Sequence, residues 1–520
     1  MRRDVDEQQV GRREFLAAAG AAGASLALAA CGTSGDATTH ASALIEAAKK
    51  KAKAPTPKLP GPGSIKALQR AMKGHVFTRS TPGFASASHV YNERFDGVKP
   101  LVVARPVSAA DVAAGVNWAV HNGVSLRARS GGHSYAGYST LSNGLVLDLR
   151  RLNGISVNKH AKTATIGAGA QLIDVYNGLA KQGAALPGGS CPSVGISGVT
   201  LGGGMGLAGR AFGLTADNLI GATIVTADGK IRTVDAHHNP DLLWALKGGG
   251  GGNFGVVTQF TFKVHAMPQS ATDFFVTFPW SEASDAIAAW QSWAPHAPDA
   301  LTSIFHLNGP GSSAAVQVSG QYLGPQSKVG SFLGPLKAVR GAQVTTGQHD
   351  WVTLQMLWAG CLTKTLPECH TIGAAPGGTL ARASFQAKSD YVTKALPAAG
   401  RAALVSAVEK RQSQPGSGAI LFDSYGGAIN RVKPGATAFV HRNALFCIQY
   451  LSYNGGAAWL QQTHGAMAKY VSGQAYQNYI DPNLKGWQKA YYGSNYARLQ
   501  KIRKQVDPHH HFTFPQAIGR

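Results

Sequence analysis

The chain has 520 residues, 44% of them hydrophobic and 14% charged, and a formal net charge of +23. A single hydrophobic core stops growing at about 250–300 residues, so this length predicts two domains, and the composition argues against a disordered chain. The positive charge alone would suit nucleic acid, an anionic envelope or acidic glycans. No RNA- or DNA-reading motif accompanies it, so we expect no nucleic-acid partner.

Residues 1–31 have the pattern of an export signal. The stretch Gly-Arg-Arg-Glu-Phe-Leu at 11–16 precedes an Ala-rich apolar run that ends at Cys31. The stretch resembles a bacterial twin-arginine signal, and its end resembles a lipoprotein cleavage box. The run is shorter than the roughly 20 residues that span a membrane, and alanine is weakly hydrophobic. We therefore expect export by a twin-arginine-type route, either to the extracellular space or to the cell surface with a lipid anchor at Cys31.

Residues 32–63 are rich in Ala, Lys and Pro, which is typical of a solvated linker, and 64–95 follow as a lead-in helix and loop. From 96 to 268 short strands and helices alternate, as in a mixed α+β domain. The Asp228-Gly229 pair marks a hairpin turn, because glycine adopts the positive φ that a two-residue turn requires. The predicted elements are strands at 101–106, 125–129, 145–149 and 256–264, hairpins at 155–170 and 218–234, and helices at 108–123, 171–181 and 241–247.

The pattern changes at about residue 269, where longer alternating strands begin. Phe274, Val276 and Phe278 would share one face of a strand, and a helix would begin near Ser281. We expect a second domain of sheet plus helices over 269–475. The last segment, 476–520, differs again, because it contains a helix at 496–506 that ends before a proline.

The sequence holds five cysteines. Cys361 and Cys369 could form a disulfide in an exported protein. Cys447 lies in the apolar run Phe446-Cys447-Ile448 of a predicted strand. We expect its thiol to be buried and structural.

Two glycine-rich stretches, 130–132 and 195–204, are compatible with a phosphorylated cofactor. Without a Cβ, successive backbone N–H groups can surround a pyrophosphate, although the same glycines could simply form tight turns. Residues 204–209 also match the G-x-G-x-x-G fingerprint of nicotinamide-binding folds. That match is weak, because the acid expected about 20 residues later would be Asp228, which belongs to the hairpin turn.

Five motifs that occur in order carry a resemblance to a known family. They are Arg-Ser-Gly-Gly-His-Ser-Tyr at 129–135, Gly-x-Cys-x-x-Val-Gly at 189–195, the three glycines at 202–204, Gly-Leu-x-Ala-Asp-Asn at 213–218, and the stretch 244–255, in which Trp-Ala-Leu-Lys is followed by glycines and Asn-Phe-Gly. Together they resemble the berberine-bridge-enzyme-like oxidases of the vanillyl-alcohol-oxidase group of flavoproteins, from about Tyr91 to the C-terminus. The resemblance implies an α+β fold with a two-subdomain PCMH-type FAD-binding domain (96–268, completed by 476–520) and a substrate domain (269–475) of antiparallel sheet covered by helices.

The resemblance also implies FAD held by two covalent bonds. His133 would bond the flavin 8α carbon and Cys191 the ring carbon C6, since neutral imidazole and thiolate are good nucleophiles. Without the resemblance, His133 could be a turn histidine and Cys191 an unreactive thiol. The other residues expected to bind the cofactor are Arg129, Ser130, Gly131, Gly132, Ser134, Val194, Gly195, Gly198, Asn253, Gly255 and Val257.

Tyr479, in a stretch that resembles the family's Asn-Tyr-x-Asp, is the candidate base for a substrate hydroxyl. A phenol with a pKa near 10 is a poor base at neutral pH, so a positive charge, the flavin or another hydroxyl would have to favour the phenolate. Gln449 would orient Tyr479 or the substrate, and Tyr135 would line the pocket. The two tyrosines could instead pack in the core, and Gln449 could lie on the solvent face of a strand.

The resemblance implies an FAD-linked oxidase that acts on a CH–OH group, with dioxygen as the acceptor and hydrogen peroxide as a product. The expected export favours a small molecule of the sugar or oligosaccharide class as the substrate. A tailoring oxidase of a secondary metabolite and a non-catalytic basic envelope-binding protein are the alternatives.

Two positions depart from the family pattern. Val199 stands where many relatives have histidine, and Phe212 stands where many have tyrosine, so polar contacts near the flavin would be lost. The histidines at 509–511 lie inside a stretch that resembles the family's C-terminal signature. Adjacent histidines point in different directions, so we expect no metal site.

Overall fold

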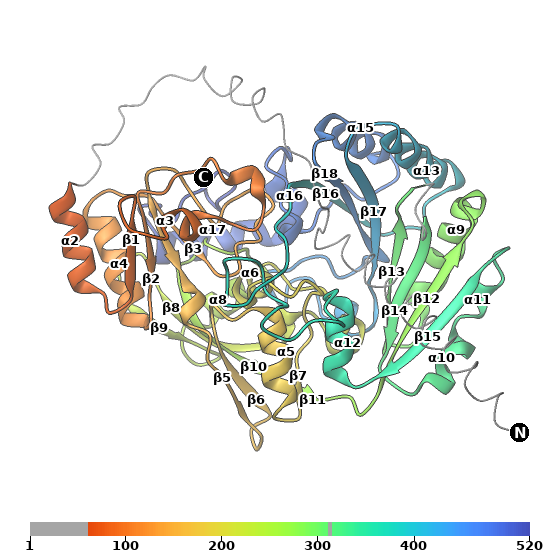
Figure 1. Cartoon of the computed structure of the whole chain (residues 1–520), viewed down its shortest axis with the longest axis horizontal. Coiled ribbons are helices and arrows are strands. Elements are labelled where there is room, and N and C mark those ends of the chain that lie inside the picture. The colour runs from red at the N-terminus through yellow and green to blue at the C-terminus, as the bar shows by residue number, and fades with distance from the viewer. Residues whose placement is uncertain (1–60, 310–314) are drawn as a thin grey trace, which may run out of the picture.

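A computed structural model describes residues 61–309 and 315–520 (Figure 1). The predicted export signal, Cys31 and nearly all of the 32–63 linker lie outside the described residues. Within the described ranges, no helix is both long enough and apolar enough to cross a membrane. The described chain has an α+β fold with helices and four separate sheets.

The first sheet has short strands in the order β1-β2-β4-β3. β1 pairs with β2 antiparallel, whereas β4 runs parallel to both β2 and β3. The sequence predicted only a helix and a loop over 64–95, but β1 lies there; with Val76 as its one buried residue, it shows too little alternation to be recognised. The strands are β1 (His75–Thr78), β2 (Val102–Arg105), β3 (Leu126–Arg129) and β4 (Leu145–Asp148).

Helix α4 (Ala109–His121) links β2 to β3 and begins at the predicted cap. The Ser108 hydroxyl accepts a hydrogen bond from the Asp111 amide at 3.1 Å, which satisfies an N–H of the first turn. The Asp111 carboxylate accepts hydrogen bonds from the amides of Lys73, Gly74 and Val107, at 2.9 Å each. The start of the helix is thereby tied to the segment that leads into β1.

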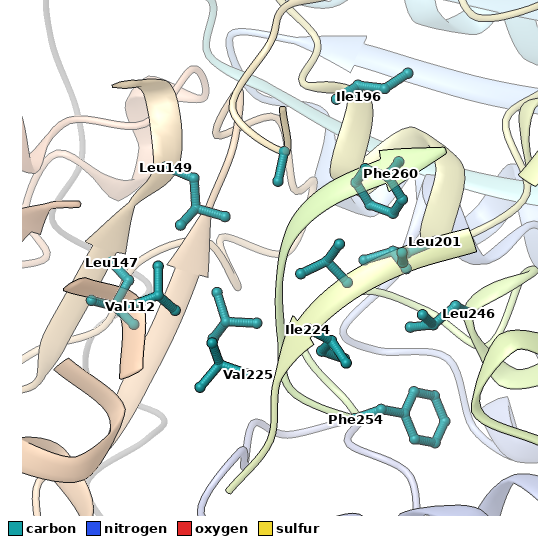
Figure 2. Close-up of a cluster of buried hydrophobic side chains, with 14 of the residues drawn as sticks. Val112, Leu147, Leu149, Ile196, Leu201, Ile224, Val225, Leu246, Phe254 and Phe260 are labelled. Atoms are coloured by element: carbon teal, nitrogen blue, oxygen red, sulfur yellow. The ribbon is translucent and has the colours of Figure 1, made fainter. Parts of the chain in front are cut away.

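The second sheet is antiparallel, in the order β5-β6-β10-β8-β9. The predicted Asp228-Gly229 turn joins β8 to β9, and Gly229 has a φ of +70°. Helix α4 packs against both sheets, so one core joins them: in Figure 2, Leu147 and Val112 lie on one side and Ile224 and Phe260 on the other. The strands are β5 (Ile155–Asn158), β6 (Thr163–Gly167), β8 (Leu219–Val225), β9 (Ile231–Val234) and β10 (Val256–Lys263).

The largest sheet has seven antiparallel strands in the order β15-β12-β14-β13-β17-β18-β16. Phe274, Val276 and Phe278 share one face of β12, as predicted, and belong to the core beneath helices α9 (Ala283–Trp293), α13 (Ala398–Gln412) and α15 (Ala457–Met467) (Figure 1). Side chains alternate along a strand, so the other face of this sheet is turned toward the first two sheets. The strands are β12 (Ala271–Phe278), β13 (Leu301–Leu307), β14 (Val316–Tyr322), β15 (Gln343–His349), β16 (Phe385–Val392), β17 (Ser417–Ser424) and β18 (Phe446–Tyr453).

The C-terminal segment packs against the core of the first two sheets. Helix α17 (Tyr496–Val506) matches the predicted bounds and buries Leu499 and Ile502 in that core. A single 3₁₀ turn (Gln477–Tyr479) precedes α16 (Trp487–Tyr492) and lies beside β16 of the large sheet. The segment therefore brings Tyr479 to the boundary between the two halves of the molecule.

Short elements complete the described chain, and a disulfide joins Cys361 to Cys369, as the sequence suggested. Cys447 is buried in β18, also as predicted. The remaining elements are helices α2 (Pro62–Ala71), α3 (Phe84–Ser88), α5 (Leu172–Ala180), α6 (Ile196–Leu201), α7 (Gly209–Phe212), α8 (Pro240–Leu246), α10 (Gln326–Phe332), α11 (Gly334–Lys337), α12 (Trp351–Trp358) and α14 (Gly427–Arg431), and the paired strands β7 (Ala184–Ala185) and β11 (His265–Ala266).

Candidate active site

A cavity of about 300 Å³ lies where the loops of the first two sheets meet the inner face of the large sheet. Its walls come from distant parts of the sequence: the loops at 130–139, 189–198 and 251–257, strands β13 and β17, and the C-terminal segment. All the predicted site residues line it except Arg129 and Asn253. The fold therefore brings His133, Cys191 and Tyr479 to one cavity.

Glycines allow the loops that carry His133 and Cys191 to touch. A Cβ on Gly131 would lie 2.3 Å from the Gly195 nitrogen, and a Cβ on Gly195 would lie 2.2 Å from the Gly131 nitrogen. Neither distance is possible for a real side chain, so these two positions require glycine for close backbone packing. Gly198 differs, because a Cβ there would meet no atom within 4 Å. It borders the cavity itself and leaves space for a ligand.

His133 is held by two neighbours. Tyr91 stacks on its imidazole ring, with 3.9 Å between ring centroids and 17° between ring planes. The Ser193 hydroxyl lies 2.9 Å from Nε2. Burial lowers the pKa of His133 to about 3, so the ring is neutral at physiological pH and retains a nucleophilic lone pair.

Arg129 and Asn253 lie behind the cavity wall. The Arg129 guanidinium is buried, donates to Asp148 at 3.0 Å and to the carbonyl of His89 at 3.1 Å, and so fixes the end of β3. Asn253 accepts a hydrogen bond from the Ile518 amide at 3.0 Å, which ties its glycine loop to the C-terminal segment. Both side chains were predicted to bind the cofactor, but their partners are protein groups. They hold the loops whose glycines face the cavity.

Tyr479 and Tyr135 form a stacked pair in the cavity, with ring centroids 5.5 Å apart and planes inclined by 9°. The Tyr479 hydroxyl donates a hydrogen bond to Oδ2 of Asp423 at 3.2 Å. Gln449 Nε2 donates to the Tyr135 hydroxyl at 2.8 Å. Gln449 is only 1% exposed, so it does not lie on a solvent face, and it orients Tyr135 rather than Tyr479 directly.

Asp423, at the end of β17, is a site residue that the sequence analysis missed. Burial raises the pKa of its carboxyl to about 7, although the Tyr479 hydrogen bond lowers it. Burial and then the negative charge of Asp423 raise the pKa of Tyr479 well above 10. From the sequence, a positive charge, the flavin or another hydroxyl was expected to favour the phenolate; the hydrogen-bond partner in the structure is a carboxylate that can accept the phenol proton. The available signal was an acid at the end of the apolar run 419–422.

The wall formed by the large sheet is polar but nearly uncharged. His306 Nε2 lies 2.7 Å from the Ser319 hydroxyl, and burial lowers the pKa of this histidine to about 4. Thr302 lies in the same wall, and Trp358 of helix α12 also lines the cavity. Among the described residues that line the cavity, Asp423 is the only carboxylate. This wall suits a ligand that is rich in hydroxyl groups and carries no charge.

The departures from the family pattern have different outcomes. Val199 lines the cavity, so an apolar side chain stands there. Phe212 stacks on His265, with 4.1 Å between ring centroids, and is not among the described cavity residues.

His509 and His510 are exposed, and the described residues contain no group of three or more His, Cys, Asp or Glu arranged to hold a metal ion.

Family models match two separate parts of the chain. The FAD binding domain matches residues 100–235, and the berberine and berberine-like domain matches 475–519. An FAD-linked oxidoreductase of Bacillus subtilis, YgaK, is 33% identical over 464 residues, which cover 86% of this chain and 97% of the relative. The chain belongs to the berberine bridge enzyme-like family of FAD-linked oxidoreductases. It is therefore an oxidoreductase of the class that the sequence predicted.

Other relatives of this oxidoreductase include named carbohydrate oxidases. A xylooligosaccharide oxidase of Thermothelomyces thermophilus is 30% identical over 471 residues, covering 85% of this chain and 92% of the relative. The BBE-like 1 structure from Physcomitrella patens has a TM-score of 0.80 and 32% identity, covering 88% and 98% of the two chains. A glucooligosaccharide oxidase structure from Acremonium strictum, described as carrying 6-S-cysteinyl, 8α-N1-histidyl FAD, has a TM-score of 0.79 and 28% identity, covering 88% and 99%.

The cavity of this oxidoreductase fits FAD. Gly131, Gly195 and Gly198 form a wall on which a side chain would either strike backbone or fill the cavity. Buried polar atoms beside the cavity have no hydrogen-bond partner within the described protein, among them the Tyr138 hydroxyl and Gln477 Oε1. Unsatisfied buried polar atoms are rare in folded proteins and are consistent with a polar cofactor.

Proposed function

We propose that the chain oxidises an alcohol or hemiacetal carbon of a sugar or oligosaccharide, with FAD as the hydride acceptor and dioxygen as the final acceptor, giving hydrogen peroxide. The observation that carries this proposal is the Tyr479–Asp423 pair in the cavity that also holds His133 and Cys191. When bound, FAD supplies the chemistry of hydride acceptance, and the protein must supply orientation and a proton acceptor.

Tyr479 and Asp423 act together as that acceptor. With a pKa well above 10, Tyr479 does not rest as a phenolate. It takes the substrate hydroxyl proton at its oxygen as it passes its own proton to Oδ2 of Asp423. Asp423, with a pKa of about 7, is ionised in about half of the molecules at neutral pH, which is the range in which a general base works best. Tyr135, held by Gln449, supports the plane of the Tyr479 ring.

His133 and Cys191 are proposed to tether the cofactor, through the 8α carbon and the ring carbon C6 respectively. The 6-S-cysteinyl, 8α-N1-histidyl FAD named for the glucooligosaccharide oxidase of Acremonium strictum supports this assignment, because it has one histidyl and one cysteinyl linkage. The positions of the two residues on adjoining loops of one cavity support it further. Ser130, Ser134, Val194, Gly255 and Val257 are proposed to contact the same group, with Arg129 and Asn253 as supports behind the wall.

The proposed substrate class is a neutral sugar. The names of the xylooligosaccharide and glucooligosaccharide oxidases support it, and so does the polar wall of Thr302, His306 and Ser319. A carboxylated sugar would have to enter a cavity that carries the Asp423 carboxylate, and Arg127 is the only Lys or Arg among the described residues that line it. A uronic acid should therefore be a poorer substrate than the matched neutral sugar.

The test is a carbohydrate panel assayed for peroxide, with the flavin colour followed without oxygen in parallel. The proposal expects peroxide from neutral oligosaccharides with a free reducing end and much less from the matched uronic acids. Anaerobic bleaching without aerobic peroxide would refute dioxygen as the acceptor. Bleaching by aromatic or polycyclic alcohols only would favour the tailoring oxidase, and the absence of bleaching by any alcohol would favour the non-catalytic envelope-binding protein.

We also propose export by the twin-arginine-type route, with a lipid at Cys31. The support is the pattern of residues 11–31. Replacing both Arg12 and Arg13 with Lys should retain the protein in the cytoplasm, and replacing Cys31 with Ala should release it from the membrane fraction. Unchanged localisation in the first variant would contradict the route, and unchanged membrane association in the second would contradict the anchor.

A further inference from the structure

The side chains of Ser193 and Tyr91 both contact the His133 imidazole. Ser193 and Tyr91 are 4% and 7% exposed, so both contacts to the imidazole are buried. The sequence predicted a role for neither residue, and neither contacts Tyr479 or Asp423 in the hydrogen bonds and ring contacts of the described residues. Their common feature is that each restricts the His133 ring in a different way.

Ser193 determines which ring nitrogen is available. A neutral imidazole carries one proton, and the nitrogen without it has the lone pair that can form a new bond. When Nε2 carries the proton and donates it to the Ser193 oxygen, Nδ1 is left with the lone pair. A serine hydroxyl also donates, so after Nδ1 has formed a bond, Ser193 can turn its own proton toward the bare Nε2.

Tyr91 restricts the plane of the ring. Its backbone amide donates to the Gly132 carbonyl at 3.1 Å, directly before His133, so the stacking partner is attached to the same loop. A stacked aromatic neighbour opposes rotation of the imidazole out of its plane. The hydrogen bond and the stack together leave the ring with one orientation.

We propose that Ser193 and Tyr91 are positioning residues for flavin attachment: Ser193 holds Nε2 of His133 so that Nδ1 bonds the flavin, and Tyr91 fixes the plane of the ring. This inference rests on the covalent FAD of the proposed function and goes beyond it by assigning residues that make the attachment possible. The N1-histidyl linkage named for the Acremonium strictum enzyme is consistent with it.

Attachment through Nδ1 releases two protons and two electrons. A bond from Nδ1 of His133 to the 8α methyl carbon of the flavin replaces a carbon–hydrogen bond of that methyl group. One proton leaves the methyl group and one leaves Nε2 through Ser193, and the electron pair of the broken bond passes to the flavin ring. Dioxygen, the oxidant already named for turnover, takes up two electrons and two protons to give hydrogen peroxide and restores the oxidised ring.

The experiment follows attachment in a full chain that carries Cys191→Ala, where His133 is the only proposed tether. Ser193→Thr and Ser193→Val form a matched pair, because the two side chains have nearly the same shape and differ by the hydroxyl. Each protein is purified after growth on limiting riboflavin, mixed with FAD, and sampled over time. Two quantities are measured: the total flavin bound, and the flavin that precipitates with the protein in acid.

Ser193→Thr should match the parent, whereas Ser193→Val should form the tether about two- to tenfold more slowly, the range given by the loss of one neutral hydrogen bond. Total bound flavin should stay equal, which a merely structural role would not predict. Tyr91→Leu should also slow attachment about two- to tenfold, and Tyr91→Phe, which keeps the stack, should not. In the parent, nuclear magnetic resonance of the flavin peptide should show the Nδ1 linkage.

Equal rates for the Thr and Val variants, or an Nε2 linkage in the parent, would overturn the role of Ser193. Equal rates for Tyr91→Leu and the parent would overturn the role of Tyr91. The absence of acid-stable flavin in the Cys191→Ala parent would overturn the His133 tether and this inference with it. None of these readouts depends on turnover, so the failure of oligosaccharide oxidation would be recognised separately in the peroxide panel.

Discussion

Replacing Asp423 with Asn removes the carboxylate that accepts the Tyr479 hydrogen bond while keeping the shape of the side chain. The amide oxygen of Asn can still accept that hydrogen bond, but it cannot take up the proton. Loss of a general base costs about 10²- to 10⁴-fold in rate, so we expect kcat to fall by that factor. The bound flavin should be retained, because Asp423 lies on β17 and not on the loops that carry His133 and Cys191.

The pH dependence follows from the pKa of about 7 that burial gives Asp423. Below that pH the carboxyl is protonated and cannot act as a base. We expect kcat/KM of the parent enzyme to fall about tenfold for each pH unit below 7 and to level off above it. In the Asp423→Asn variant, kcat/KM should no longer fall as the pH is lowered below 7. Asp241→Asn, which removes an exposed carboxylate paired with Arg498 at 2.7 Å, should keep this fall and serves as the control.

Asp423→Asn should raise the free energy of unfolding at alkaline pH although it lowers the activity. A carboxyl whose pKa rises on folding stabilises the native state below its unfolded pKa, and this contribution is lost as the pH rises through the folded pKa. For Asp423, a rise from 3.8 to about 7 corresponds to about 4 kcal/mol at pH 8. Asn is neutral at every pH, so the variant should be the more stable protein at pH 8, by a margin that shrinks toward pH 5. A variant that keeps the fall in kcat/KM below pH 7, or that loses stability at pH 8, would refute the role assigned to Asp423.

Three further predictions address other parts of the site. Tyr479→Phe should lower kcat by about 10²- to 10⁴-fold with little change in flavin content, measured by steady-state turnover and visible absorption; near-normal turnover would contradict its role. Gly131→Ala places a Cβ 2.3 Å from the Gly195 nitrogen, so the purified protein should lack flavin, whereas Gly435→Ala, with no atom within 4 Å, should keep it. Replacing Cys361 and Cys369 with Ser should lower the free energy of unfolding by about 2–3 kcal/mol in chemical denaturation, and an unchanged value would contradict the stabilising role of the disulfide.

Short motifs predicted much of the cofactor side of the molecule. His133 and Cys191 lie on two loops that meet at Gly131 and Gly195, where close backbone approach requires glycine. A requirement for glycine at a close backbone contact can be recognised from a short sequence motif. The alternation of Phe274, Val276 and Phe278 likewise indicated the correct buried face of β12, because a strand repeats every two residues.

Pairings between distant segments could not be predicted in the same way. Asp423 and Tyr479 are 56 residues apart and meet only because the C-terminal segment returns to the large sheet, so no local sequence pattern links them. Arg129 was expected to bind the cofactor, but its guanidinium pairs with Asp148 on the neighbouring strand β4.

The most direct test of the proposed oxidation is anaerobic mixing of the purified enzyme with a neutral oligosaccharide, followed by the visible absorption of the flavin. We predict bleaching of the flavin in the parent, at a rate that decreases as the pH is lowered below 7, and bleaching that is about 10²- to 10⁴-fold slower in Asp423→Asn. A flavin that stays oxidised with every oligosaccharide, or a rate that does not respond to pH or to the Asn substitution, would contradict the account.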